Sequence, residues 1–291
     1  MSVASNLTAL PTLDVVIPCY NEEHDIAQCL DLLLAQADDI AQIIVVDNNS
    51  TDTTPKILKQ YSAAHQNITV LRETRQGVEF ARDTGLAHAT SDIIARIDVD
   101  ARVQPGWARA LRDFYGTHSD VQASTGATEY YDLPARRFTN FMTWFFMTVS
   151  NELLAGSVNL YGANMSIRKD AWESIKDELP GRDTHVMEDL AISLALQRQA
   201  KKIAYVPAAM AHVSGRRMRT SPRKFARYNA QWPATYRVMG YPDKARIITP
   251  VSWFGNFLQT LLALLLLFHN PHTGKFGIRN FKHGYEGRQL P

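Results

Sequence analysis

Two aspartates, Asp98 and Asp100, directly follow an apolar run that ends at Ile97. Carboxylates at the end of a strand are poorly placed for a core and well placed for a hard cation, because Mg²⁺ and Mn²⁺ prefer oxygen ligands. Surface loops contain many such pairs, so the pair alone is weak evidence. It predicts a divalent-metal site only if other polar clusters accompany it.

Polar clusters also follow two earlier apolar runs. Tyr20-Asn21-Glu22 closes the run 13–20, and Asp47-Asn48-Asn49-Ser50 closes the run 43–48. The carboxyl ends of parallel strands meet at one edge of a sheet, where ligands gather. Three strand ends that carry acids or amides therefore favour one shared site.

The elements that must position these clusters alternate between strand and helix up to about residue 120. The apolar and β-branched runs predict strands at 13–20, 43–48, 68–73 and 92–101, and helical spacing predicts helices at 22–37, 51–65 and 77–90. Further strands are expected at 121–131 and 203–214, with helices at 135–154 and 187–202. The pattern predicts an α/β fold with a mostly parallel sheet.

The composition fits an ordinary globular protein. The chain has 291 residues, 45% of them hydrophobic and 21% charged, which excludes a disordered or fibrous chain. Two cysteines, Cys19 and Cys29, cannot form a disulfide framework and favour a reducing compartment. The first residues contain neither Lys nor Arg nor a long apolar run, so export by a cleaved signal is not expected.

Five segments together resemble the family 2 glycosyltransferases with the GT-A fold. They are VVIPCYNEE (15–23), IIVVDNNSTDTT (43–54), RQGVEFARDTGL (75–86), IDVDARVQP (97–105) and MEDLAISLAL (187–196). The resemblance covers roughly residues 13–215. It implies a Rossmann-like, mixed and mostly parallel sheet with flanking helices. It also implies an inverting transfer from a nucleotide-sugar donor, with UDP as the first expectation, that depends on Mg²⁺ or Mn²⁺.

The resemblance also implies residues that bind the donor. The loop at the end of the first predicted strand would line the nucleotide site. Asp47 would accept hydrogen bonds from the base, and Asp98 would face ribose or sugar hydroxyls. The implied donor-binding residues are Pro18, Tyr20, Glu22, Asp47, Gly77, Arg82 and Asp98. Asp47 as a turn acid and Arg82 as a surface cation remain alternatives. Asp83 departs from the family's usual Asn at this position.

Metal binding and catalysis are assigned by the same resemblance. Asp100 would hold the metal on the diphosphate, and His212 would be a further ligand, although a lone histidine is more often structural. Asp189 would be the general base that removes the proton of the acceptor hydroxyl. Glu188 beside it would lie on the acceptor side. The alternative is that Glu188 and Asp189 only balance a helix dipole.

The acceptor side is expected in two further segments. Tyr161, Gly162 and Asn164 would line the acceptor pocket, with an ordinary turn before a helix as the alternative. In the aromatic helix, helical spacing predicts a core stripe of Phe138, Phe141, Met142, Phe145 and Val149. Trp144, Phe146 and Met147 fall off this stripe and would leave an apolar surface for the lipid of an acceptor or for the segment 251–268. A lipid-linked acceptor is therefore one hypothesis, and a soluble acceptor is the other.

The C-terminal part is basic and then apolar. Residues 201–250 contain eleven Lys and Arg against one acid, and residues 251–268 carry no charge. The resemblance implies a transferase domain at 1–215, and this pattern predicts a helical tail at 216–291 that docks to the cytoplasmic membrane face, peripherally or as an anchor. Whether 251–268 spans the membrane, lies on it or packs in a core stays open. Nucleic acid is not expected, because zinc-ligand and RNA-binding signatures are missing.

Other functions fit the sequence less well. Processive polymerases of the family carry a Gln-x-x-Arg-Trp element, whereas Gln231 and Trp232 are adjacent here, so transfer of a single sugar is expected. A nucleotidyltransferase would need a glycine-rich, basic phosphate loop, which IPCYNEE is not. An inactive membrane scaffold would not need the acids at positions 47, 98, 100 and 189.

Overall fold

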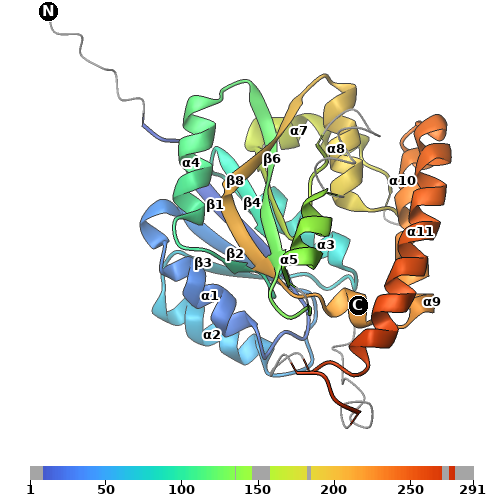
Figure 1. Cartoon of the computed structure of the whole chain (residues 1–291). Coiled ribbons are helices and arrows are strands. Elements are labelled where there is room, and N and C mark those ends of the chain that lie inside the picture. Colours follow the sequence, from blue (N-terminus) through green and yellow to red (C-terminus); the bar gives the residue numbers. More distant parts are fainter. Residues whose placement is uncertain (1–8, 135, 146–157, 182–184, 271–274, 279–291) are drawn as a thin grey trace, which may run out of the picture.

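An eight-stranded sheet forms the centre of the molecule (Figure 1). The computed structural model describes residues 9–134, 136–145, 158–181, 185–270 and 275–278. The strand order is β3-β2-β1-β4-β7-β6-β8-β5. The strands are β1 (Leu13–Cys19), β2 (Gln42–Asp47), β3 (Ile68–Arg72), β4 (Ile93–Ile97), β5 (Arg102–Val103), β6 (Val121–Tyr130), β7 (Asn164–Arg168) and β8 (Lys202–Val213).

The first four strands are parallel to one another. All seven residues of β1 are buried, as expected for a strand that is covered on both faces. β7 then pairs antiparallel with β4 and β6, while β8 runs parallel to β6 and antiparallel to β5. The predicted mixed, mostly parallel sheet is confirmed, and β5 and β7 are strands that we did not anticipate.

Helices cover both faces of the sheet. One core contains Leu30 of α1 (Ile26–Leu34), Leu58 of α2 (Thr54–Ala64) and Trp107 of α4 (Trp107–Thr117). The other core contains Leu86 of α3 (Val78–His88), Trp172 of α7 (Lys169–Ile175) and the apolar residues of α8 (Glu188–Arg198). Two 3-10 turns, η1 (Ala37–Asp39) and η3 (Lys176–Glu178), complete these layers.

The chain after β8 packs against this domain. It forms η5 (Arg216–Arg219), α9 (Pro222–Asn229), α10 (Gln231–Val238) and α11 (Pro242–Leu266), the long helix along one side of the molecule (Figure 1). Tyr236 and Ile248 belong to the second core, and Leu266 belongs to the first. The helical extension is present as expected, but it shares both cores with residues 1–215.

The aromatic helix α5 (Arg136–Trp144) contacts the sheet through β6. Phe138 and Phe141 are 65% and 55% exposed, so the predicted core stripe is wrong at both positions. Helical spacing identified an apolar face, but no neighbouring element among the described residues covers it. Trp144 is exposed as predicted, at 44%. Phe146, Met147 and Val149 lie outside the described residues.

Candidate functional site

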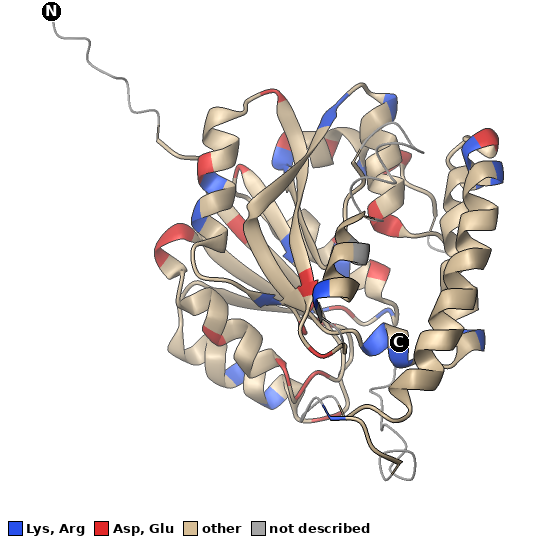
Figure 2. Cartoon of the chain, in the orientation of Figure 1, with Lys and Arg blue, Asp and Glu red and all other residues tan. Residues whose placement is uncertain are grey.

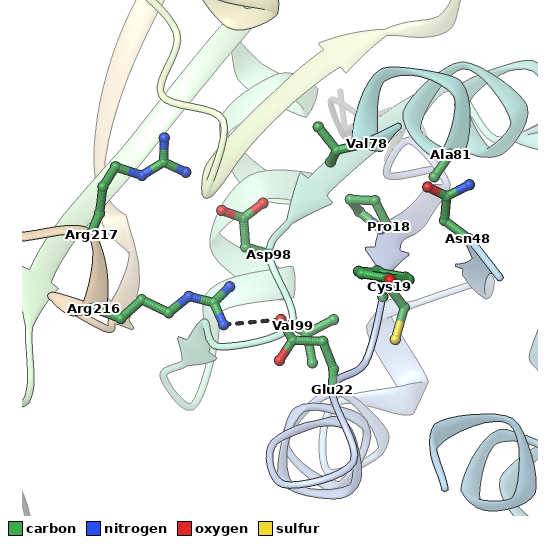
Figure 3. Close-up of a pocket in the computed structure, with 11 residues that line it drawn as sticks. Pro18, Cys19, Glu22, Asn48, Val78, Ala81, Asp98, Val99, Arg216 and Arg217 are labelled. Atoms are coloured by element: carbon green, nitrogen blue, oxygen red, sulfur yellow. Dashed lines mark hydrogen bonds and ion pairs between the residues drawn. The ribbon is translucent and has the colours of Figure 1, made fainter. Parts of the chain in front are cut away.

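A pocket lies at the carboxyl ends of β1 and β4 (Figure 3). The two strands are parallel neighbours, so the loops that follow them are adjacent. The residues that line the pocket are Pro18, Cys19, Tyr20, Glu22, Asn48, Val78, Ala81, Asp98, Val99, Arg216 and Arg217. Four residues predicted to bind the donor, from two distant segments, therefore face one pocket: Pro18, Tyr20, Glu22 and Asp98.

The wall next to β2 is held by Asn48, which we did not predict as a site residue. Its Nδ2 donates hydrogen bonds to the carbonyls of Glu73 (3.1 Å) and Arg75 (2.6 Å). Its Oδ1 accepts a hydrogen bond from the N–H of Gly77 (2.8 Å). One buried amide thus ties the end of β2 to the loop between β3 and α3. The only signal for this role in the sequence was its place after an apolar run.

Asp47 and Gly77 lie beside the pocket rather than in its lining. Oδ1 of Asp47 accepts a hydrogen bond from the N–H of Ser50 (3.1 Å). This is the bond expected if Asp47 is a turn acid, the alternative to a donor-binding role. Gly77 precedes α3 with φ of 143°, a conformation that favours glycine. This conformation starts the helix that brings Val78 and Ala81 into the pocket.

Arg216 bridges two acids at the mouth of this pocket. Its Nη1 lies 3.0 Å from Oε1 of Glu22, and its Nε lies 2.8 Å from Oδ2 of Asp100. Both acids are 7% exposed, so the ion pairs are largely shielded from water. Burial opposes the charge of Arg216, but Asp100 and Glu22 outweigh it and raise the pKa of the guanidinium. This arginine lies just beyond the boundary that the sequence predicted for the transferase domain.

The carboxylates around Arg216 have the right chemistry for a divalent cation. Glu22, Asp98 and Asp100 come from two neighbouring strand ends, and Mg²⁺ is usually held by one or two carboxylates together with phosphate oxygens. Among the described residues, no three His, Cys, Asp or Glu side chains form a complete metal site by themselves. The acids therefore fit a metal that substrate phosphates would share.

His212 lies near the end of β8, as expected from the sequence. Its Nδ1 lies 3.4 Å from Nε2 of Gln104, and its Nε2 lies 3.8 Å from Oε2 of Glu129. These contacts are those of a structural histidine. Metal ligation by His212 stays a prediction.

A second ionic cluster connects the pocket to α8. Oε2 of Glu188 accepts hydrogen bonds from Nη1 of Arg82 and from Nη1 of Arg96, each at 2.9 Å. Nη2 of Arg82 also lies 3.9 Å from Oδ1 of Asp98, which lines the pocket. Glu188 is 7% exposed and pairs with both arginines, and its predicted place on the acceptor side stays a prediction. The side chain of Arg82 is largely buried, which also excludes the surface-cation alternative.

The two arginines of this cluster differ in their surroundings. Burial opposes the charge of Arg82, but Glu188, Asp98 and Asp189 outweigh it and raise its pKa. Burial and the neighbouring charge of Arg82 lower the pKa of Arg96. The neighbouring acids therefore offset the desolvation of the Arg82 charge, but they do not fully offset that of the Arg96 charge.

Arg96 is a cluster residue that the sequence analysis missed. It lies in β4, is 1% exposed, and its Nε donates to the carbonyl of Gly162 (3.1 Å). Its Nη2 has no hydrogen-bond partner among the described residues. The signal was available, because Arg96 is the one charged residue inside the apolar run IIARI. A buried charge needs a partner, and Glu188 supplies it.

Asp189, the predicted base, lies at the start of α8 next to this cluster. Its Oδ2 accepts a hydrogen bond from the N–H of Gly162 (2.8 Å), and its Oδ1 accepts one from the N–H of Leu190 (2.9 Å). A Cβ on Gly162 would lie 2.1 Å from Nη2 of Arg96 and 3.1 Å from Oδ2 of Asp189. Only glycine fits between the arginine and the carboxylate. The two bonds fix the orientation of the carboxylate.

The other predicted acceptor residues take structural roles. Asn164 is 1% exposed, and its Oδ1 accepts a hydrogen bond from Nε1 of Trp107 (2.9 Å). Its Nδ2 donates to the carbonyls of Ala127 and Ala209, both at 2.9 Å. The prediction that Asn164 lines an acceptor pocket is therefore wrong, because its amide is used inside the core. Tyr161 is partly buried and packs against the first core, and burial raises the pKa of its phenol.

Comparison with known proteins places this geometry in a family. The family described as "Glycosyl transferase family 2" matches residues 14–175, more than half of the chain. The glycosyltransferase AglE of Haloferax volcanii is 30% identical over 175 residues, which are 58% of this chain and 56% of that protein. The glucosyl-dolichyl phosphate glucuronosyltransferase of the same organism is 24% identical over 181 residues, 60% of this chain and 56% of that protein. The chain thus spans little more than half of either relative.

A solved structure extends the similarity in fold to nearly the whole chain. The mannosyltransferase PcManGT from Pyrobaculum calidifontis, in complex with GDP-Man and Mn²⁺, superposes with a TM-score of 0.60. The match covers 95% of this chain and 79% of that one, at 18% sequence identity. The predicted GT-A architecture is thereby confirmed.

Proposed function

The chain belongs to glycosyl transferase family 2, and we propose that it transfers a single sugar from a nucleoside diphosphate sugar to an acceptor, with inversion. One observation carries the proposal: Arg82 connects Asp98 in the pocket to Glu188, which precedes Asp189 in α8. An inverting transfer needs a donor site and a base on opposite sides of the reacting sugar. The ionic cluster links the pocket to the start of α8, which supports such an arrangement.

The pocket would bind the nucleoside diphosphate. Pro18 and Tyr20 offer apolar and aromatic surface to the nucleotide, and the guanidinium groups of Arg216 and Arg217 offer planar donors to phosphate oxygens. Asp100 and a neighbouring acid would hold Mg²⁺ or Mn²⁺. The ion, when bound, supplies positive charge that stabilises the diphosphate as it leaves. UDP is the first expectation for the nucleotide, and GDP and dTDP are the alternatives.

Asp189 would act as the general base. The acceptor O–H gives its proton to the carboxylate as the oxygen attacks the anomeric carbon, and the electrons of the breaking glycosidic bond pass to the diphosphate oxygen. The N–H groups of Gly162 and Leu190 hold the two carboxylate oxygens in place. Each oxygen keeps a further lone pair for the acceptor hydroxyl.

A lipid-linked acceptor at the cytoplasmic face of a membrane is the acceptor class that we favour. The exposed Phe138, Phe141 and Trp144 of α5 offer apolar surface close to the domain. One relative is named for transfer to a dolichyl phosphate sugar. Both observations support a hydrophobic carrier over a free sugar.

The test is a donor screen. The purified full chain is incubated with UDP-, GDP- and dTDP-sugars and Mn²⁺, with polyprenyl phosphate or a soluble sugar as acceptor, and the released nucleoside diphosphate is measured. We expect acceptor-dependent release from one donor class, and none from the Asp189→Asn variant. Formation of a nucleotide sugar from a nucleoside triphosphate and a sugar phosphate would instead identify a nucleotidyltransferase.

A further inference from the structure

The long helix α11 has one apolar side that no described part of the chain covers. Its exposed large residues recur at helical spacing, so they form one stripe. They are Ile247, Trp253, Phe254, Phe257, Leu258, Leu261, Leu264 and Leu265, between 38% and 70% exposed. An uncovered apolar stripe of this length marks an interaction surface.

The opposite side of α11 is bonded to the domain. Nδ2 of Asn229 in α9 donates to the carbonyl of Ser252 (2.8 Å) and to Oδ1 of Asn256 (2.9 Å). Two turns later, Nε2 of Gln259 donates to the carbonyls of Met218 (3.0 Å) and Thr220 (3.2 Å). Ser252 and Gln259 are 2% and 3% exposed. The helix is therefore fixed to the protein along its length.

This two-sided arrangement decides between the orientations that the sequence left open. A helix that crosses a bilayer would leave α9 and η5, and Gln259 would enter the hydrocarbon without its two carbonyl partners. A helix in the plane of the membrane surface keeps these bonds and buries only its apolar stripe. We propose that α11 docks to an anionic membrane surface in this in-plane orientation.

Charge identifies the membrane as the occupant rather than a second copy of the chain. Arg223, Lys224 and Arg227 are exposed on α9, and Arg246 is exposed at the start of α11. Residues 216–270 contain nine Lys and Arg and a single acid, Asp243. In the cartoon of Figure 2, charged residues colour the first turns of α11 and the rest of the helix is tan. A two-fold contact through this side would bring like charges together, whereas anionic lipid attracts them.

The docked helix would also hold the donor pocket near the lipid. Gln259 bonds the backbone of η5 and the residue after it, and η5 carries Arg216 and Arg217 of the pocket. This step rests on the proposed function, because it explains how a lipid-linked acceptor reaches the sugar donor. The docking itself does not depend on transfer.

Vesicle binding of the full chain tests the docking. We would compare flotation with vesicles of phosphatidylcholine and with an equimolar mixture of phosphatidylcholine and phosphatidylglycerol. Phe257→Glu/Leu261→Glu on the stripe is expected to weaken binding to the anionic vesicles about tenfold or more, because it places two charges in the lipid-facing side. Gln60→Glu/Ala63→Glu on the exposed side of α2 adds the same charge and should bind like the parent chain.

The orientation is tested by membrane depth. Spin labels on Phe254→Cys and Leu265→Cys lie about 16 Å apart along a helix, from the rise per residue. Equal shallow depths support the in-plane helix, whereas a large difference in depth would show a span and overturn the proposal. Unchanged vesicle binding of the stripe variant, or dimerisation without lipid that the same variant abolishes, would also overturn it. Nucleotide binding, measured on the same samples, separates failure of docking from failure of the transferase proposal.

Discussion

The guanidinium Nε of Arg216 lies 2.8 Å from Oδ2 of Asp100, so a cation of the protein itself already neutralises the proposed metal-binding carboxylate. The same guanidinium reaches Glu22. The arginine and a divalent cation would therefore compete for the same oxygens, while both favour an incoming diphosphate.

Arg216→Met should separate these two effects. Nucleoside diphosphate affinity is expected to fall by about 10- to 150-fold, because a charge-assisted hydrogen bond contributes about 1.5–3 kcal/mol. Mn²⁺ affinity without nucleotide should rise, since Asp100 and Glu22 lose their guanidinium. Calorimetry and Mn²⁺ titration measure both, with Arg109→Met on the surface as control. Equal affinities in the variant and the parent chain would show that Arg216 is only structural.

Asp189→Asn should remove transfer and keep nucleotide binding. The amide retains the shape of the carboxylate but cannot take the acceptor proton, so the rate of transfer is expected to fall by about 10²–10⁴-fold. Nucleoside diphosphate release measures the rate, and calorimetry measures binding. Asp170→Asn changes an exposed acid in the first turn of α7 and serves as the matched control. Retained turnover in Asp189→Asn would contradict the role of the base.

Arg96→Met should reveal how much the ionic cluster contributes to stability. Without Arg96, the buried carboxylate of Glu188 keeps only Arg82 as an ion-pair partner. Breaking a buried ion pair lowers the free energy of unfolding by about 3–5 kcal/mol. Urea unfolding measures this cost. Arg96→Lys should recover part of the stability and less of the rate of transfer, because an ammonium group cannot contact Glu188 and the Gly162 carbonyl with the same geometry. A near-neutral Arg96→Met would show that the cluster contributes little.

The pocket was the most predictable part of the site. Pro18, Tyr20, Glu22 and Asp98 each lie at or just after the end of an apolar run, and adjacent parallel strands bring the ends of those runs together. Both facts follow from local patterns: the hydrophobic run marks the strand, and the alternation with helices makes the strands parallel.

The residues that the sequence did not identify depend on pairing across long distances. Arg216 meets Glu22, which lies 194 positions earlier in the chain, and Asp100, which also lies in a distant segment, and nothing in its local sequence indicates these contacts. Asn164 follows a glycine-containing turn, as an acceptor residue would, yet the antiparallel strand β7 places it in the core. The spacing of residue types along the chain predicts neither that β7 lies between β4 and β6 in the sheet nor how α5 packs.

Gly162→Ala tests the close approach of Arg96 and Asp189. The new Cβ would lie 2.1 Å from Nη2 of Arg96, so the arginine or the backbone must move. Overpacking of this kind costs about 1–3 kcal/mol, and displacement of Asp189 should lower the rate of transfer as well. Apart from its chain neighbours, a Cβ built on Gly181 has no atom of the described residues within 4 Å, so Gly181→Ala is the matched control in thermal unfolding. A Gly162→Ala protein with the stability and rate of the parent chain would refute the packing argument.

The stability of the pocket wall should depend on pH through Glu73. Hydrogen bonds from Arg75 and Thr84 lower the pKa of its carboxyl group, and its backbone carbonyl accepts the hydrogen bond from Asn48. A carboxyl group whose pKa is lowered in the folded state stabilises fully above its unfolded pKa, about 4.3, and loses this contribution as the pH falls. Glu73→Gln should therefore lower the free energy of unfolding most at neutral pH, and the difference from the parent chain should shrink in acid.

Urea unfolding across this pH range measures that difference, and Asp38→Asn, an exposed acid, is the control for charge alone. Because Asn48 bonds the Glu73 carbonyl and lines the pocket, nucleotide affinity should weaken in Glu73→Gln at neutral pH as well. A stability difference that stays constant from neutral to acid pH would mean that the ionised carboxylate of Glu73 does not hold this wall.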